Sequence, residues 1–180
     1  GYTPTCPAPP IQFMNAINVT GNNATLQWVP AGVETEWIIE YGTNGYSQGS
    51  GISSFDTSTT VTIVGLLPIT NYDFYVQAIC GLGDTSLWSG PFTFVTPCAT
   101  LTPPQLEDFS LGFPPNTCWD QADDGDQFTG PTSIGTSSWS TDGFGNVGTT
   151  GAVKINLFTL GKSDWVLSPQ YDFSNGGPFQ

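Results

Sequence analysis

Residues 66–78 read LLPITNYDFYVQA, and this stretch decides the fold of the first half of the chain. After the turn-forming Pro68, apolar side chains occupy every second position: Tyr72, Phe74, Val76 and Ala78. A period of two places these side chains on one face of a β-strand. We therefore expect a strand here that buries its aromatic and aliphatic face.

The same alternation recurs on both sides of this strand, between clusters of Gly, Pro, Asn and Ser. The apolar members of the further runs are Ala24, Leu26 and Trp28; Trp37, Ile39 and Tyr41, with Glu36 and Glu40 on the opposite face; Val61 and Ile63; and Phe92 and Phe94. Short strands separated by turn signals are typical of an all-β sandwich or barrel. We expect seven strands within residues 6–97, which is the size of one sandwich domain.

The stretch 66–78 also resembles a known family. Its order of leucine, proline, threonine, tyrosine, valine and alanine is similar to the signature of the fibronectin type III domain. Trp28 stands where that family has a core tryptophan, and residues 86–94 resemble the approach to its last strand. The resemblance implies a fibronectin type III sandwich over residues 1–97. It also implies that Tyr72 is the corner tyrosine, whose hydroxyl bonds to upstream backbone.

Four cysteines without a C-x-x-C pair favour two disulfides formed in an oxidising compartment. Spacing alone leaves all three pairings open. In the fold that the resemblance implies, Cys6 and Cys80 lie at one pole and Cys98 lies at the other. The resemblance therefore favours the pairs Cys6–Cys80 and Cys98–Cys118.

Four apolar residues are expected on the outer face of one sheet of this sandwich. If the alternate positions point inward, the outward ones are Ile38, Tyr75, Ile79 and Val95. An exposed patch of this kind can mark an interaction surface. One interpretation is that the patch packs on a second domain or a partner, and the other is that these are scattered residues mixed with polar neighbours.

Residues 98–104 read as a short, proline-containing linker. The region 105–180 then resembles the start of the jelly-roll "choice-of-anchor J" and cleaved-adhesin group, which is related to MAM domains. The resemblance rests on an acidic-Phe opening, a Pro-x-x-Cys-Trp step ending at Trp119, an Asp-Gly-Asp loop at 124–126 and a segment from Trp165 to Pro169. Because such domains are about twice as long, we expect the N-terminal part of one, either as a fragment or completed by a strand from a neighbouring chain.

Charge excludes several classes of function. The 180 residues carry 15 Asp and Glu against two lysines, with no histidine, so the formal charge is −13. A polyanion cannot neutralise a phosphate backbone, so we expect no nucleic-acid binding. The absence of histidine removes Ser-His and Cys-His catalysis, and no apolar run is long enough for membrane insertion.

The acidic residues are candidates for calcium binding. Ca²⁺ takes six to eight oxygen ligands, and the group around Gly125 is rich in carboxylates. The predicted ligands are Asp120, Asp123, Asp124 and Asp126, with Glu107, Asp108 and Asp172 as further donors. The alternative is a solvated acidic turn that holds no ion.

Tryptophans offer a second kind of site, a platform for stacking sugars, although each is also a candidate core residue. The four considered are Trp88, Trp119, Trp139 and Trp165. Paired carboxylates for glycoside hydrolysis are disfavoured, since nothing places two across a sugar cleft.

These observations predict a non-catalytic, secreted or cell-surface adhesion and structural module of a larger bacterial protein. The resemblance implies export from a Gram-negative bacterium by the type IX route. The expected partners are other protein chains or extracellular polysaccharide. The alternatives are accessory binding domains of a secreted hydrolase, and a subunit of a filament that self-assembles by strand complementation.

Overall fold

The computed structural model describes residues 6–81, 83–141, 152–155, 161 and 163–174. The chain divides into two compact units, Gly1–Ala99 and Thr100–Gln180. This boundary falls within the segment expected to be a linker. Among the described residues, no helix has the length and apolar character needed to span a membrane.

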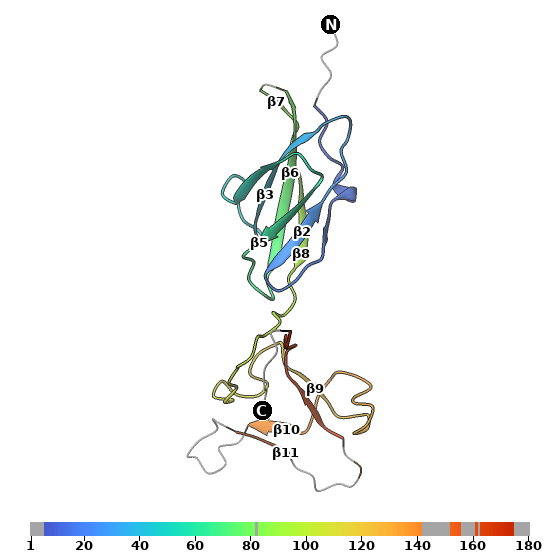
Figure 1. The fold of residues 1–180 in the computed structure, drawn as a ribbon, viewed down its shortest axis with the longest axis vertical. Coiled ribbons are helices and arrows are strands. Elements are labelled where there is room, and N and C mark those ends of the chain that lie inside the picture. Colours follow the sequence, from blue (N-terminus) through green and yellow to red (C-terminus); the bar gives the residue numbers. More distant parts are fainter. Residues whose placement is uncertain (1–5, 82, 142–151, 156–160, 162, 175–180) are drawn as a thin grey trace. The chain divides into compact units, whose positions relative to one another are not determined.

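The first unit is a sandwich of two antiparallel sheets (Figure 1). A short 3-10 helix, η1, precedes the strands at Ile11–Phe13. One sheet has the order β1-β2-β5, and the other has the order β4-β3-β6, with both β7 and β8 paired to β6. The eight strands are β1 Asn15–Ile17, β2 Asn23–Gln27, β3 Glu36–Thr43, β4 Ile52–Asp56, β5 Thr60–Val64, β6 Asn71–Gly81, β7 Asp84–Thr85 and β8 Ser89–Val95.

The core of this unit lies between the two sheets and follows the predicted alternation. The register of β3 against β6 pairs Trp37 with Ala78 and Ile39 with Val76, so their inward side chains meet in one layer. The buried cluster consists of Met14, Ala24, Leu26, Trp28, Trp37, Ile39, Tyr41, Ile63, Leu66, Tyr72, Phe74, Val76, Ala78 and Phe94. The predicted all-β sandwich is therefore confirmed, and the two-residue β7 is a strand beyond the seven that were expected.

Tyr72 is the predicted corner residue. The Leu67 N–H donates to the Tyr72 hydroxyl oxygen at 2.9 Å, which closes the turn before β6. The same turn contains Ile69 with φ of 52°, a left-handed conformation that is unusual for a β-branched residue. The tyrosine and the turn together fix where β6 begins.

Glu40 shows where the alternation alone was misleading. Its side chain was expected on the solvent face of β3, opposite Ile39, yet its exposed fraction is only 2%. The loop after β3 folds back over this face, and the Gly49 and Gly51 N–H groups donate to Glu40 Oε1 at 2.6 and 2.9 Å. The loop that supplies these donors also covers the carboxylate. The local sequence pattern does not predict this burial.

The described part of the second unit has shorter elements. Its strands form two antiparallel pairs, β9 with β12 and β10 with β11. Their bounds are β9 Asp120–Ala122, β10 Trp139–Thr141, β11 Val153–Ile155 and β12 Trp165–Leu167. An isolated bridge also joins Leu101 to Tyr171. All the regular elements in the described part of this unit are β-strands, whereas its predicted jelly-roll architecture stays a prediction.

Candidate functional site

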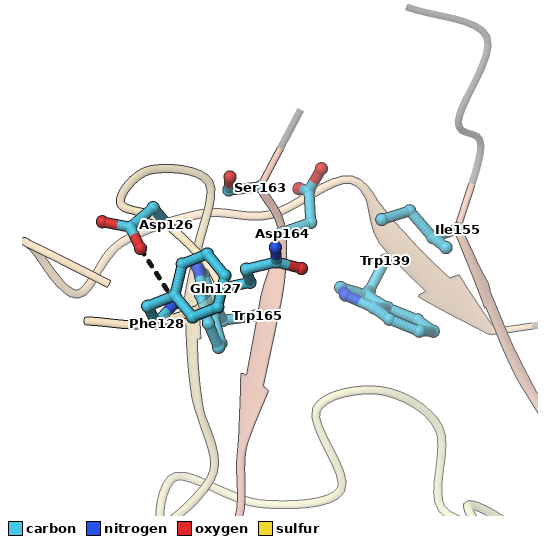
Figure 2. A pocket seen from close by; sticks show the side chains of 8 residues that line it. All are labelled: Asp126, Gln127, Phe128, Trp139, Ile155, Ser163, Asp164 and Trp165. Carbon is cyan, nitrogen blue, oxygen red and sulfur yellow. Dashed lines mark hydrogen bonds between the residues drawn. The ribbon is translucent and has the colours of Figure 1, made fainter. Parts of the chain in front are cut away.

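An open cleft of about 740 Å³ lies in the second unit (Figure 2). It is lined by Asp126, Gln127, Phe128, Trp139, Ile155, Ser163, Asp164 and Trp165. Three aromatic side chains and a few polar groups converge in it. Its volume lies within the range of ligand-binding pockets, which are likewise lined by apolar and aromatic side chains with a few polar groups.

A network centred on Asp124 fixes the loop that forms one wall of the cleft. The Asp124 carboxylate accepts hydrogen bonds from the backbone N–H and the hydroxyl of Thr132. It also accepts from the N–H and hydroxyl of Ser133, at 3.2 and 2.7 Å. These bonds, those from the Thr132 side chain most of all, lower the pKa of Asp124 to about 2. The carboxylate therefore stays ionised and ties residue 124 to residues eight and nine positions later.

The adjoining turn presents Phe128. Asp126 accepts from the Phe128 N–H at 2.8 Å (Figure 2) and from the Thr129 hydroxyl at 2.5 Å. Gly125 has φ of 82°, and a Cβ on it would lie 2.1 Å from the Gly130 carbonyl oxygen. Only glycine fits at this position. The result is a turn that holds an aromatic ring 87% exposed to solvent.

Trp165 is held in place by a strand pairing and by a hydrogen bond of its side chain. It pairs with Ala122 in the β9–β12 ladder, and its indole Nε1 donates to the Asp124 carbonyl oxygen at 2.7 Å. The indole ring is thus attached to the same loop that carries Phe128. Figure 2 shows Phe128 and Trp165 together at one side of the cleft.

Trp139 and Ile155 form the opposite side. They are cross-strand partners in the β10–β11 pair, so they project on the same face of that ribbon (Figure 2). The Ser138 N–H donates to Asp164 Oδ1 at 2.6 Å, which attaches β10 to the segment before β12. The cleft therefore brings together segments that are far apart in the sequence.

Two buried polar atoms of the cleft residues are unpaired. Among the described residues, Trp139 Nε1 and Asp164 Oδ2 have no hydrogen-bond partner. The indole Nε1 of Trp139 can only donate a hydrogen bond, and a carboxylate oxygen such as Asp164 Oδ2 accepts one. A buried polar group without a partner is uncommon in folded proteins and requires an explanation.

The predicted calcium ligands do not converge on a common centre. Among the described residues, no group of three or more Asp, Glu, His or Cys side chains is arranged to hold a metal ion. Several of these carboxylates accept instead from nearby backbone N–H groups, as Glu107 does from Phe109, Asp108 from Ser110 and Asp172 from Ser174. Asp120 and Asp123 are exposed. Calcium binding stays a prediction without a described ligand cluster in its favour.

The four tryptophans separate into two groups. Trp139 and Trp165 line the cleft. Trp119 packs edge-to-face on Phe109, with ring centroids 5.6 Å apart, and Trp88 is half-buried in the first unit. Nothing in the sequence pattern singles out Phe128, whose only signal is that an aromatic residue follows an acidic turn.

The expected outer patch of the first unit is partly covered by its own loop. Ile38, Tyr75 and Ile79 are half-buried, whereas Val95 is 56% exposed. The Tyr46 ring meets that of Tyr75 edge-to-face at 5.8 Å. Burial, and next the charge of nearby Glu40, raises the pKa of the Tyr46 phenol. A role for this patch in partner binding stays a prediction.

The disulfides agree with the expected framework. Cys6 and Cys80 are bonded, with a Cα–Cα distance of 5.6 Å across a sequence separation of 74 residues. Cys98 and Cys118 are disulfide-bonded as well, and none of the described cysteines is free. An oxidising compartment is where such bonds form and persist.

The sheets, core and corner tyrosine define the class of the first unit as a two-sheet β-sandwich. Residues 9–95 match the fibronectin type III domain family, so this unit is a fibronectin type III domain, as its sequence predicts. The chain is similar to the fibronectin type III domain of human collagen α-1(XX), with 20% identity, a TM-score of 0.45 and coverage of 59% of this chain and 97% of that one. It is also similar to the FN1–FN3 domains of chicken CNTN1, with 14% identity, a TM-score of 0.46 and coverage of 53% and 31%.

A relative with similarity across both units is Endoglucanase B of Cellulomonas fimi. The two are 28% identical over 179 residues, an alignment that covers 91% of this chain. The chain spans only 12% of the length of that relative.

Proposed function

We propose that the chain is a non-catalytic adhesion and binding segment of a larger secreted protein. The fibronectin type III domain serves as a structural spacer, and the cleft of the second unit contacts an extracellular partner. The observation that carries this proposal is the cleft itself, in which the Trp165 indole is held by a hydrogen bond to Asp124, Phe128 projects from a hydrogen-bonded turn and Trp139 projects from the β10–β11 pair. Rigid aromatic side chains that are already ordered lose little conformational entropy on binding.

The chemistry of the cleft supports binding over catalysis. Its two carboxylates belong to Asp126 and Asp164. Hydrogen bonds from the Thr129 hydroxyl and the Phe128 N–H lower the pKa of Asp126, whereas a general acid needs a raised pKa. The sequence offers no histidine as a substitute proton shuttle.

The second candidate function is that of an accessory segment within a secreted polysaccharide hydrolase. It is favoured by the similarity to Endoglucanase B along most of this chain. Because that alignment spans a small part of the relative, the chain corresponds in this proposal to an accessory segment. Under either candidate the module works outside the cell, which the disulfide bonds support. Assembly into filaments stays a prediction that the molar mass in solution tests.

Retention of the whole chain on coated surfaces tests the binding proposal. The probes are insoluble cellulose, xylan, chitin and gelatin, with release of reducing sugar measured in parallel. We expect retention on at least one surface, a large loss with the double variant Phe128→Ala/Trp139→Ala, and no sugar release. The control is Leu87→Ala, an exposed residue of the first unit. Equal retention of the cleft variant and the control, or no retention at all, would contradict the proposal.

A further inference from the structure

The free edge of β5 lacks the features that keep most sheet edges from pairing with other chains. Among the described strands, β5 pairs with β2 alone (Figure 1). It contains no charge and no proline, and its register against β2 runs without interruption. At other edges, β1 has only three residues, and β8 contains Pro91 and shifts register against β6. Short strands, prolines, charges and bulges are the usual protection of an edge, and β5 has none of them.

The backbone of β5 directs hydrogen-bonding groups to this open side. The Trp28 N–H donates to the Thr59 carbonyl oxygen at 3.1 Å, which continues the register of the β2–β5 ladder. Hydrogen-bonded pairs alternate along an antiparallel ladder, so Thr62 and Val64 lie at positions that do not bond to β2. Their N–H and C=O groups therefore point away from β2, where a further strand can pair with them.

The sheet that contains this edge carries no charge. None of the residues of β1, β2 and β5 is charged, although the whole chain has a formal charge of −13. The carboxylates of the first unit lie in the other sheet and in the loop before β3. Two copies of an anionic chain repel each other where their charges meet. The β5 edge is a place where two copies can meet without that repulsion.

Exposed apolar side chains accompany the open edge. Val64, at the end of β5, is 70% exposed. Residues 57–59 join β5 to β4, which is the edge strand of the other sheet on the same side of the sandwich. On β4, Ile52 and Phe55 are 62% and 58% exposed. A second chain beside this edge would remove part of this apolar surface from water.

We propose that β5 pairs antiparallel with β5 of a second copy of this chain, which forms a two-fold dimer with one continuous sheet. The two-fold axis passes beside Thr62, the middle residue of the strand, and Thr60 then lies opposite Val64 of the second copy. Threonine and β-branched aliphatic side chains suit such cross-strand pairs. The Thr60 N–H already donates to Ser58 Oγ at 3.2 Å, so Thr62 and Val64 supply the donors that gain a partner. This inference does not rest on the proposed function of the cleft.

Sedimentation equilibrium of the whole chain tests the proposal. The mean mass should rise from that of the monomer at about 10 µM toward that of the dimer at about 1 mM, because so small an interface binds weakly. Thr62→Lys places two like charges opposite each other at the axis and should abolish the rise. The matched control is Thr25→Lys on the central strand β2. The Thr25 and Thr62 hydroxyls bond to each other at 3.0 Å, so both variants lose this contact and gain the same charge. The control should dimerise as the wild type does.

Hydrogen exchange then locates the contact. At the higher concentration the amides of Thr62 and Val64 should exchange more slowly. The amides of Val61 and Ile63, which bond to β2 within one copy, should not change. A mass that stays monomeric up to about 1 mM, or that rises beyond the dimer, would overturn the proposal. Equal dimerisation of Thr62→Lys and Thr25→Lys, or a dimer without slower exchange at Thr62 and Val64, would overturn it as well.

Discussion

The two units reach order by different means. The first unit has an 11-residue strand, Asn71–Gly81, paired along most of its length, and a cluster of 14 buried hydrophobic residues. The described strands of the second unit have three residues each. Among its described residues, Ala122 is buried, and most other apolar side chains are half-buried or exposed.

In the second unit, hydrogen bonds to carboxylates in turns supply part of the order that the hydrophobic core supplies in the first unit. The Asp124 carboxylate accepts hydrogen bonds from Thr132 and Ser133. The Asp126 carboxylate accepts hydrogen bonds from Phe128 and Thr129. A hydrophobic core stabilises a fold but hides its side chains. Hydrogen-bonded turns can hold an aromatic side chain in the solvent, which is what a binding surface requires.

The sharpest contrast between the units should come from one residue type. Phe74 is fully buried in the first unit, and Phe128 is 87% exposed in the second. Phe74→Ala should lower the free energy of unfolding by about 3–5 kcal/mol, because it leaves a cavity. Phe128→Ala should change it by less than about 0.5 kcal/mol. Urea denaturation of both variants measures this, and similar losses in the two would contradict the contrast.

The disulfide Cys6–Cys80 should contribute nearly as much to the first unit. It closes a loop across a separation of 74 residues. The double variant Cys6→Ala/Cys80→Ala should lose about 2–5 kcal/mol of unfolding free energy. Thermal unfolding followed by near-ultraviolet circular dichroism would show the loss. An unchanged melting temperature would mean that the core alone holds this unit together.

Gly125→Ala should act on the second unit and leave the first unaffected. The left-handed backbone costs about 1–2 kcal/mol for a residue with a side chain, and the new Cβ would lie 2.1 Å from the Gly130 carbonyl oxygen. We expect faster hydrogen exchange of the amides of residues 124–133. The amides of β6 are the internal control. Unchanged protection of the loop would show that its geometry does not depend on the glycine.

Acid should loosen the same loop. The folded-state pKa of Asp124, about 2, lies below its ordinary value of 3.8. The hydrogen bonds of its carboxylate therefore stabilise the loop above pH 3.8, and that stabilisation is lost as the pH falls toward 2. An NMR titration of the Thr132 amide should follow this change, and Asp124→Asn should abolish it. A midpoint near 4 in the wild type would contradict the shift.

The smallest effect concerns strain in the first unit. Ile69 is half exposed and has φ of 52°, which disfavours a β-branched side chain. Ile69→Gly should raise the free energy of unfolding by up to about 1 kcal/mol, since the relief of strain outweighs the entropy of glycine. Ile52→Gly, in the extended strand β4, should lower it by about 0.5–1 kcal/mol. Destabilisation by both changes would show that the Ile69 side chain makes a necessary contact.

The fold of the first unit could be predicted because alternation reports burial directly. Trp37, Ile39 and Phe74 are buried where the period of two places them. Glu40 could not be predicted, because its burial depends on a loop that returns over the sheet. That loop is held by Gly49 and Gly51, whose donors carry no signal in the pattern.

The cleft could be predicted only in part. Trp139 and Trp165 were candidates for a sugar platform, but the sequence did not separate them from Trp88 and Trp119. The distinction depends on register, since the β10–β11 pairing places Trp139 beside Ile155. The carboxylates around Gly125 indicated calcium, whereas the structure engages Asp124 with hydroxyl and amide donors.

One titration tests whether the second unit binds the ligand while the first unit does not. A soluble neutral oligosaccharide, cellohexaose or xylohexaose, is added to the whole ¹⁵N-labelled chain, and the indole N–H signals of the tryptophans are followed by NMR. We expect the signals of Trp139 and Trp165 to move, while those of Trp28 and Trp37, which are buried in the first unit, stay unchanged. Movement confined to the first unit, or no movement with either sugar at millimolar concentration, would contradict it.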